Sequence, residues 1–295
     1  MAAGAIYPKI RVHDLPDDPS AGELLTHGFA RSSARLFKNL SESDPESIHQ
    51  ARVATRRLRS DLRTFGPLLE GSARALRRDL KPLAAALGEV RDRDVFMHWV
   101  ADNMEVLDET DQLVAEALLG AFGRRREEGL VRLHVYLETF EGLAERLTAW
   151  ACSPPLKAEA DRRGRKVMPP LVRRRWNCLK SAVREPGPKD GAALHRIRVL
   201  TKRVRYGAEL VAPAIGRKAD RFAAAAAIVQ DVLGEHHDAV VGHRILVGVA
   251  RRLAPRYAVA LGQLAGLELV RRRQAEADWE PAFVALNRKE LRKWM

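Results

Sequence analysis

One basic helical motif occurs twice in the chain, and this duplication restricts the folds that the chain can adopt. The first copy begins at His49 and the second at His195, 146 positions later, and both read His-x-x-Arg-x-x-x-(Arg or Lys)-x-x-Arg. The same offset relates the Leu-Gly-Glu run at 87–89 to an identical run at 233–235, without insertion or deletion. Repeats this long are duplicated subdomains rather than solenoid units. The sequence therefore predicts two similar halves.

Hydrophobic periodicity is helical nearly everywhere and breaks at proline and glycine, which predicts an all-α protein. Helix start signals are duplicated: Asp44 precedes a proline in the first half, and Asp190 stands at the same place in the second. Stop signals follow at 66–67 and at 212–213. We expect two pseudo-symmetric helical-bundle repeats of about four helices each around a central basic groove. They form a single domain, 1–295, with repeat 1 at 20–152 and repeat 2 at 166–295.

The cations of each motif copy fall in one narrow sector of the helix, beside the apolar sector that the helix buries. From His49 to Arg63 this stripe extends about 21 Å at 1.5 Å per residue. Clustered positive charge at the edge of a core is costly to hold unless an anion fills the groove beside it. Closely spaced arginine forks suit linked phosphate groups, and histidine adds a donor that is charged at mildly acidic pH.

The candidate phosphate-binding residues come from both motif copies. They are His49, Arg52, Arg56, Arg57, Arg59, Arg63, His195, Arg198, Lys202, Arg203 and Arg205. Eight further arginines could widen the site, although surface charge explains each of them as well: Arg31, Arg35, Arg125, Arg126, Arg173, Arg174, Arg271 and Arg272.

No catalytic residue, cofactor or metal site is predicted. Asp94 with His98 and the run at 236–238 do not recur in both halves, so helix caps or salt bridges explain them better than metal ligation. Gly88 and Gly234 lie inside expected helices, which indicates close helix crossings rather than phosphate loops.

The paired motifs resemble those of the CHAD family, the conserved histidine α-helical domain. The similarity rests on the two histidine motifs and on the Leu-Gly-Glu-Val-Arg-Asp-x-Asp-Val run at 87–95, and it extends over almost the whole chain. This resemblance implies two helical bundles around a basic channel that binds inorganic polyphosphate, in proteins found at polyphosphate granules. Many relatives carry the domain beside a triphosphate-tunnel enzyme domain, whereas this sequence resembles the stand-alone form.

Composition also indicates an anionic partner, because 51 Lys and Arg against 38 Asp and Glu leave a net charge of +13. No run of about 18 apolar residues and no signal-peptide pattern occurs, so we expect a cytoplasmic protein with no membrane partner. Protein partners cannot be inferred.

Three functions remain open: a non-catalytic polyphosphate-binding module, a nucleic-acid-binding protein and a phosphate-processing enzyme. Nucleic acid is expected only as a weaker competitor, because the stripes lack interleaved aromatic residues apart from Tyr206. An enzyme that transfers phosphate with Mg²⁺ needs convergent carboxylates, and the stripes contain almost none.

Overall fold

The computed structural model describes residues 7–187 and 189–295, and the fold in these ranges is all-α, as predicted. The helices are α1 (Ala21–Leu40), α2 (Pro45–Thr64), α3 (Ala73–Asn103), α4 (Glu109–Glu138), α5 (Glu141–Cys152), α6 (Gly164–Val167), α7 (Pro169–Arg184), α8 (Gly191–Ile215), α9 (Arg217–Ala250), α10 (Pro255–Leu286) and α11 (Lys289–Arg292). The first six residues of the predicted domain lie outside the described ranges. The bounds of the two repeats remain a prediction.

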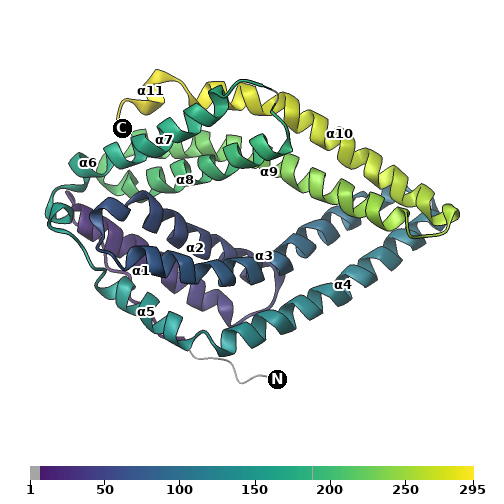
Figure 1. Cartoon of the computed structure of the whole chain (residues 1–295), viewed down its shortest axis with the longest axis horizontal. Coiled ribbons are helices and arrows are strands. Elements are labelled where there is room, and N and C mark those ends of the chain that lie inside the picture. Colours follow the sequence, from purple (N-terminus) through teal and green to yellow (C-terminus); the bar gives the residue numbers. More distant parts are fainter. Residues whose placement is uncertain (1–6, 188) are drawn as a thin grey trace.

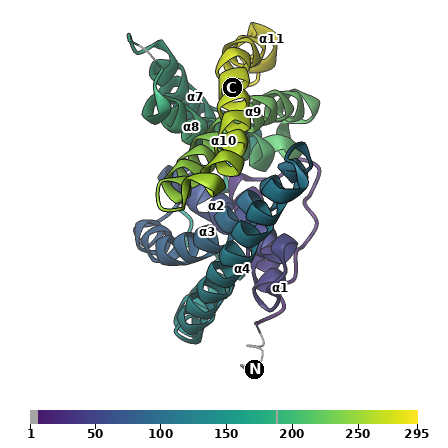
Figure 2. The same cartoon turned by 90° about the vertical axis from the view of Figure 1, so that its right-hand side faces the viewer.

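The two halves of the chain lie one above the other, with α7–α11 stacked over α1–α4 (Figure 2). In the first half α1, α2 and α3 pack side by side, and α7, α8 and α9 do so in the second. The long α3–α4 and α9–α10 hairpins extend toward the same end of the molecule, where α4 contacts α10 (Figure 1). Between the halves, α2 contacts α8 directly. The two helices that carry the basic motifs are therefore neighbours.

The interior consists of a large core and a smaller one. Ile48 and Leu58 of α2 and Ile197 and Val204 of α8 lie in the large core, which joins the two halves. The smaller core lies where the hairpins meet, around the Phe96–Phe122 pair. Because burial of apolar area is the main favourable term in folding, the apolar faces of α2 and α8 hold the two basic stripes in place.

Both predicted N-caps are present. Asp44 Oδ1 accepts hydrogen bonds from the backbone N–H groups of Glu46 and Ser47, each at 3.0 Å, and Asp190 Oδ1 accepts one from Ala193 at 2.8 Å. The helices that follow begin at residues 45 and 191, which are 146 positions apart. The start signals read from the sequence are thus confirmed at both sites.

Two predictions from helix-breaking residues are wrong. Helix α8 does not stop at 212–213 but continues to Ile215, and Gly216 with φ of 74° ends it. Pro213 is exposed and lies in the last turn, where its missing N–H and its ring disturb little of the helix. A Cβ added at Gly88 would lie 3.8 Å from the Arg52 guanidinium of α2, an ordinary contact with a side chain, and a Cβ at Gly234 would meet nothing within 4 Å, so Gly234 marks no close helix crossing.

We predict that Asp190→Ala lowers the free energy of unfolding by about 1 kcal/mol, the usual contribution of an N-cap. The variant loses the bond to the Ala193 N–H at the start of α8. Urea denaturation followed by circular dichroism measures the change. Asp190→Ser keeps a capping oxygen and should recover most of the loss, so equal effects of both substitutions would contradict a capping role.

Candidate anion-binding site

Four cations meet where α2 packs on α8, and we call them the inner cluster: Arg52, Arg56, Arg198 and Lys202. Burial and, after it, repulsion from the other three cations together lower the pKa of Lys202 to about 6. Burial also lowers the pKa of Arg56 and Arg198, and the charge of Arg52 acts in the same direction on both. Cations from two helices in different halves are therefore close enough to repel one another.

Several guanidinium donors on these helices are buried and unsatisfied. The Nε atoms of Arg56, Arg59 and Arg198 are shielded from solvent and have no hydrogen-bond partner among the described residues. A buried donor without a partner costs about 1–3 kcal/mol. An anion placed between α2 and α8 would offset this cost and reduce the charge repulsion together.

Two carboxylates partly compensate the inner cluster. Asp92 Oδ1 of α3 accepts a hydrogen bond from Arg52 Nη1 at 2.7 Å, and its side chain remains 61% exposed. Burial raises the pKa of Asp238 on α9, while the charges of Arg198 and Arg271 act against that rise. The two aspartates are 146 positions apart, as are the arginines beside them. They leave the inner cluster with excess positive charge.

The histidines of both motifs lie next to a further basic residue, and their pKa values are lowered rather than ordinary. Burial and then the charge of Arg91 lower the pKa of His49. The His195 ring lies 5.1 Å from that of His237, whose pKa falls to about 4 through burial and the charges of Arg198 and His195. The sequence reasoning missed His237. The sequence did hold a signal for it: His237 stands 146 positions after Arg91, so the two residues occupy equivalent places beside the two motif histidines.

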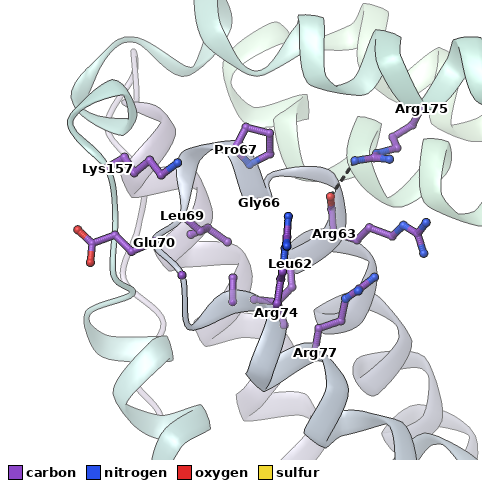
Figure 3. A pocket seen from close by; sticks show the side chains of 12 residues that line it. Leu62, Arg63, Gly66, Pro67, Leu69, Glu70, Arg74, Arg77, Lys157 and Arg175 are labelled. Carbon is purple, nitrogen blue, oxygen red and sulfur yellow. Dashed lines mark hydrogen bonds between the residues drawn. The ribbon is translucent and has the colours of Figure 1, made fainter.

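A second group of arginines, the outer cluster, lies at the C-terminal end of α2: Arg59, Arg63, Arg74, Arg77, Arg175 and Arg203. Four of them, Arg63, Arg74, Arg77 and Arg175, line a cavity of about 740 Å³ (Figure 3). Arg175 Nη2 donates to the Arg63 carbonyl at 2.9 Å. Burial and then the charges of Arg63, Arg175 and Arg77 together lower the pKa of Arg203 to about 10.

Half of the outer cluster could not be read from the motifs. Arg74 and Arg77 come from α3 and Arg175 from α7, outside the duplicated stripes. Within the run at 173–175, the predicted Arg173 and Arg174 are exposed, and only Arg175 is partly buried. The run of three arginines is visible in the sequence. Which of the three faces α2 depends on how α7 packs against that helix, and the sequence does not show this.

Other predicted cations lie beside carboxylates. Arg57 and Arg205 both bind Glu209, the latter at 2.8 Å, and the Arg57 guanidinium lies 4.8 Å from the centre of the Tyr206 ring. Arg31 and Arg35 line a separate cavity of about 360 Å³ together with Asp61, Glu209 and Asp220. The predicted stripe is therefore divided between a strongly basic side and a mixed side.

The remaining predicted arginines lie on the hairpins. Arg126 binds Asp94 at 2.5 Å, Arg272 binds Glu276 at 2.8 Å, and Arg271 binds Glu235 and Glu268. Arg125 is exposed and lies over the Phe122 ring. No group of three or more metal-ligating side chains occurs in the described part of the chain. None of the helices described is long and apolar enough to cross a membrane.

Comparison with known proteins identifies a family and two relatives that match most of this chain. The CHAD domain model matches residues 24–247. Two uncharacterized proteins of Mycobacterium tuberculosis, from strains CDC 1551 / Oshkosh and ATCC 25618 / H37Rv, are each 31% identical over 215 residues, which is 68% of this chain. The chain spans 40% of the length of these curated relatives.

Two solved structures share the fold. The CHAD domain from the plant Ricinus communis has a TM-score of 0.70 at 24% identity, over 96% of this chain and 97% of that one. PptA from Streptomyces chartreusis has a TM-score of 0.73 at 19% identity, over 90% of this chain and 99% of that one.

We predict that Lys202→Met stabilises the protein more at pH 6 than at pH 10. The pKa of Lys202 is lowered from 10.5 to about 6, so between these values the unfolded chain binds the proton more tightly. The parent protein therefore becomes more stable as pH rises from 6 toward 10.5, and the advantage of the variant shrinks. Thermal unfolding at pH 6, 8 and 10 measures this difference, with Lys218→Met on the exposed side of α9 as the control. A constant difference across this range would refute the prediction.

Proposed function

This chain belongs to the CHAD domain family, and on that premise we propose that it binds inorganic polyphosphate without changing it chemically. The observation that carries the proposal is the inner cluster, in which Arg56 of α2 and Arg198 of α8 have buried, unsatisfied Nε–H donors and are close enough to repel each other. These donors call for an anion that reaches both helices. The proposed place of action is the cytoplasm, at polyphosphate granules.

A linear ligand suits the arrangement better than a compact one. The stripe on α2 leads from the inner cluster through Arg59 to Arg63 in the outer cluster, and the charge of Arg63 acts on Arg203 of α8. Cations thus follow one another along both helices. A chain of phosphates can use successive groups at once, so that each contact after the first forms intramolecularly.

Binding alone is favoured over catalysis by the positions of the carboxylates. Phosphoryl transfer uses carboxylates to hold Mg²⁺ beside the transferred group. Asp92 is already bonded to Arg52, and the charges of Arg198 and Arg271 act on Asp238. These contacts support a role for both aspartates in positioning arginines.

Nucleic acid is proposed as a weaker ligand that competes through its phosphates. Single-stranded DNA and RNA gain much of their affinity from bases that stack on exposed aromatic rings. Tyr206, the aromatic residue in the second motif, is 4% exposed and therefore unsuited to stacking on a base.

We predict that long-chain polyphosphate binds more tightly than single-stranded or duplex DNA at matched phosphate concentration. Affinity should fall steeply with added salt, because the ligand is held mainly by charge. A competition titration at about 50 and 200 mM salt tests both statements. Equal or tighter binding of DNA at both salt concentrations would overturn polyphosphate as the preferred ligand.

Charge reversal in either helix should weaken polyphosphate binding by about 100-fold or more, since two charge-assisted contacts are lost. The two variants are Arg52→Glu with Arg56→Glu, and Arg198→Glu with Lys202→Glu. Their combination should cost less than the product of the separate losses, because both pairs act on one ligand. Isothermal titration calorimetry gives the affinities.

A matched control reverses two exposed arginines at the turn between α9 and α10, Arg251→Glu with Arg252→Glu. This control changes net charge equally and should retain most of the affinity. Circular dichroism confirms that each variant is folded. Multiplicative losses for the two helix variants would indicate separate sites on α2 and α8.

A further inference from the structure

A second cavity lies apart from the two arginine clusters, where α1 and α2 meet α8 and the first turn of α9. Its volume is about 360 Å³, within the usual range of small-molecule sites. No residue of the inner or the outer cluster lines it. Helices α1 and α8 approach closely beside it, since a Cβ at Gly28 would clash with the Leu210 side chain, and both residues line the cavity.

Asp61 of α2 lines this cavity with a carboxyl group that has no partner. The residue is 3% exposed, and its Oδ1 is buried without a hydrogen bond to any described residue. The nearby Arg57 pairs with Glu209 instead. Burial raises the pKa of Asp61 well above its usual range, and the charge of Arg57 offsets only part of this rise. A buried carboxyl without a partner is costly, so a hydrogen-bond donor beside it would stabilise the site, and a cationic donor most of all.

Two further arginines of α1 line the same cavity and are exposed, Arg31 and Arg35. They are four residues apart, so their side chains extend over one face of the helix. Glu209 pairs with Arg57 and Arg205, and neither Arg31 nor Arg35 has an ion-pair partner among the described residues. Their guanidinium groups therefore offer donors to an anionic group at the mouth of the cavity.

The rest of the lining restricts the kind of ligand. Leu24, Leu210 and Pro213 add apolar surface to it. A simple anion would leave Asp61 without a donor, and a simple amine would leave the arginines of α1 without an acceptor. A ligand that suits the whole lining carries an ammonium group, an anionic group and a short apolar part. An α-amino acid with an aliphatic side chain has this composition.

We propose that this cavity binds a small zwitterionic amino acid, whose ammonium group donates to Asp61 and whose carboxylate accepts from Arg31 or Arg35. The aliphatic side chain lies against Leu24 and Leu210. The ligand is held without any covalent step. The inference does not rest on the proposed polyphosphate binding, because the inner cluster contributes nothing to the lining.

The test titrates the full chain with L-leucine and follows the backbone amide signals by NMR. Signals of α1 and α2 around the cavity should shift and saturate, with a Kd of about 1 mM or lower. Two analogues isolate the two charges: 4-methylpentanoate lacks the ammonium group, and 3-methylbutylamine lacks the carboxylate. Each should bind at least about tenfold more weakly than leucine, because one charge-assisted contact is lost.

Variants assign each charge of the ligand to its partner. Asp61→Asn keeps the shape of the side chain without its negative charge, so it should weaken leucine binding about tenfold or more and should not weaken binding of 4-methylpentanoate. Arg31→Gln with Arg35→Gln should weaken leucine binding and should not weaken binding of 3-methylbutylamine. Lys38→Gln, an exposed position of α1 outside the cavity, is the control and should leave the affinity for leucine unchanged. Circular dichroism checks that each variant is folded.

The outcomes bear on this site alone. The absence of saturable shifts up to about 10 mM leucine would overturn it, and so would equal binding of leucine and its two analogues. Leucine binding that persists unchanged in Asp61→Asn would also refute the proposal, because the buried carboxyl is its basis. Polyphosphate affinity is measured separately on the same protein, so the proposed function can fail while the amino-acid site stands, and the reverse.

Discussion

Repulsion between the cations of α2 and α8 is the constraint to which the rest of this structure responds. The apolar faces of the two helices pack into one core, and this packing brings Arg52 and Arg56 toward Arg198 and Lys202. The charges are tolerated because apolar burial outweighs their cost, and because Asp92 bonds to Arg52 while the negative charge of Asp238 interacts with Arg198. Part of the folding free energy is thus given up to hold a set of donors ready for an anion.

The two sides of the contact between α2 and α8 differ, although the two motifs are alike. Residue 63 is arginine, whereas Glu209 stands at the equivalent place 146 positions later. Glu209 binds Arg57 and Arg205, so their positive charge is partly balanced on that side. On the other side Arg63 is joined by arginines of α3 and α7 around the large cavity. The difference between Arg63 and Glu209 therefore makes one side of the proposed site more basic than the other.

The same clustering of buried cations accounts for the lowered pKa values of the histidines and the lysine in the site. Burial and neighbouring cations lower the pKa values of His49, His195, His237 and Lys202, so each of these groups carries less charge at neutral pH than a free side chain of its type. In the proposed function these groups would gain protons when a polyanion arrives, because its negative charge offsets the repulsion from the neighbouring cations.

The sequence by itself determined the helices, the caps at Asp44 and Asp190, and the phase of each basic stripe beside its apolar face. These features depend on neighbours within a few residues, which periodicity and capping rules describe. Only the tertiary structure decided that Arg175 bonds to Arg63, that Glu209 pairs with Arg57 and Arg205, and that burial lowers the pKa of Lys202. Periodicity shows which face a helix buries but not which helix packs against it, and both charge compensation and desolvation depend on that distant neighbour.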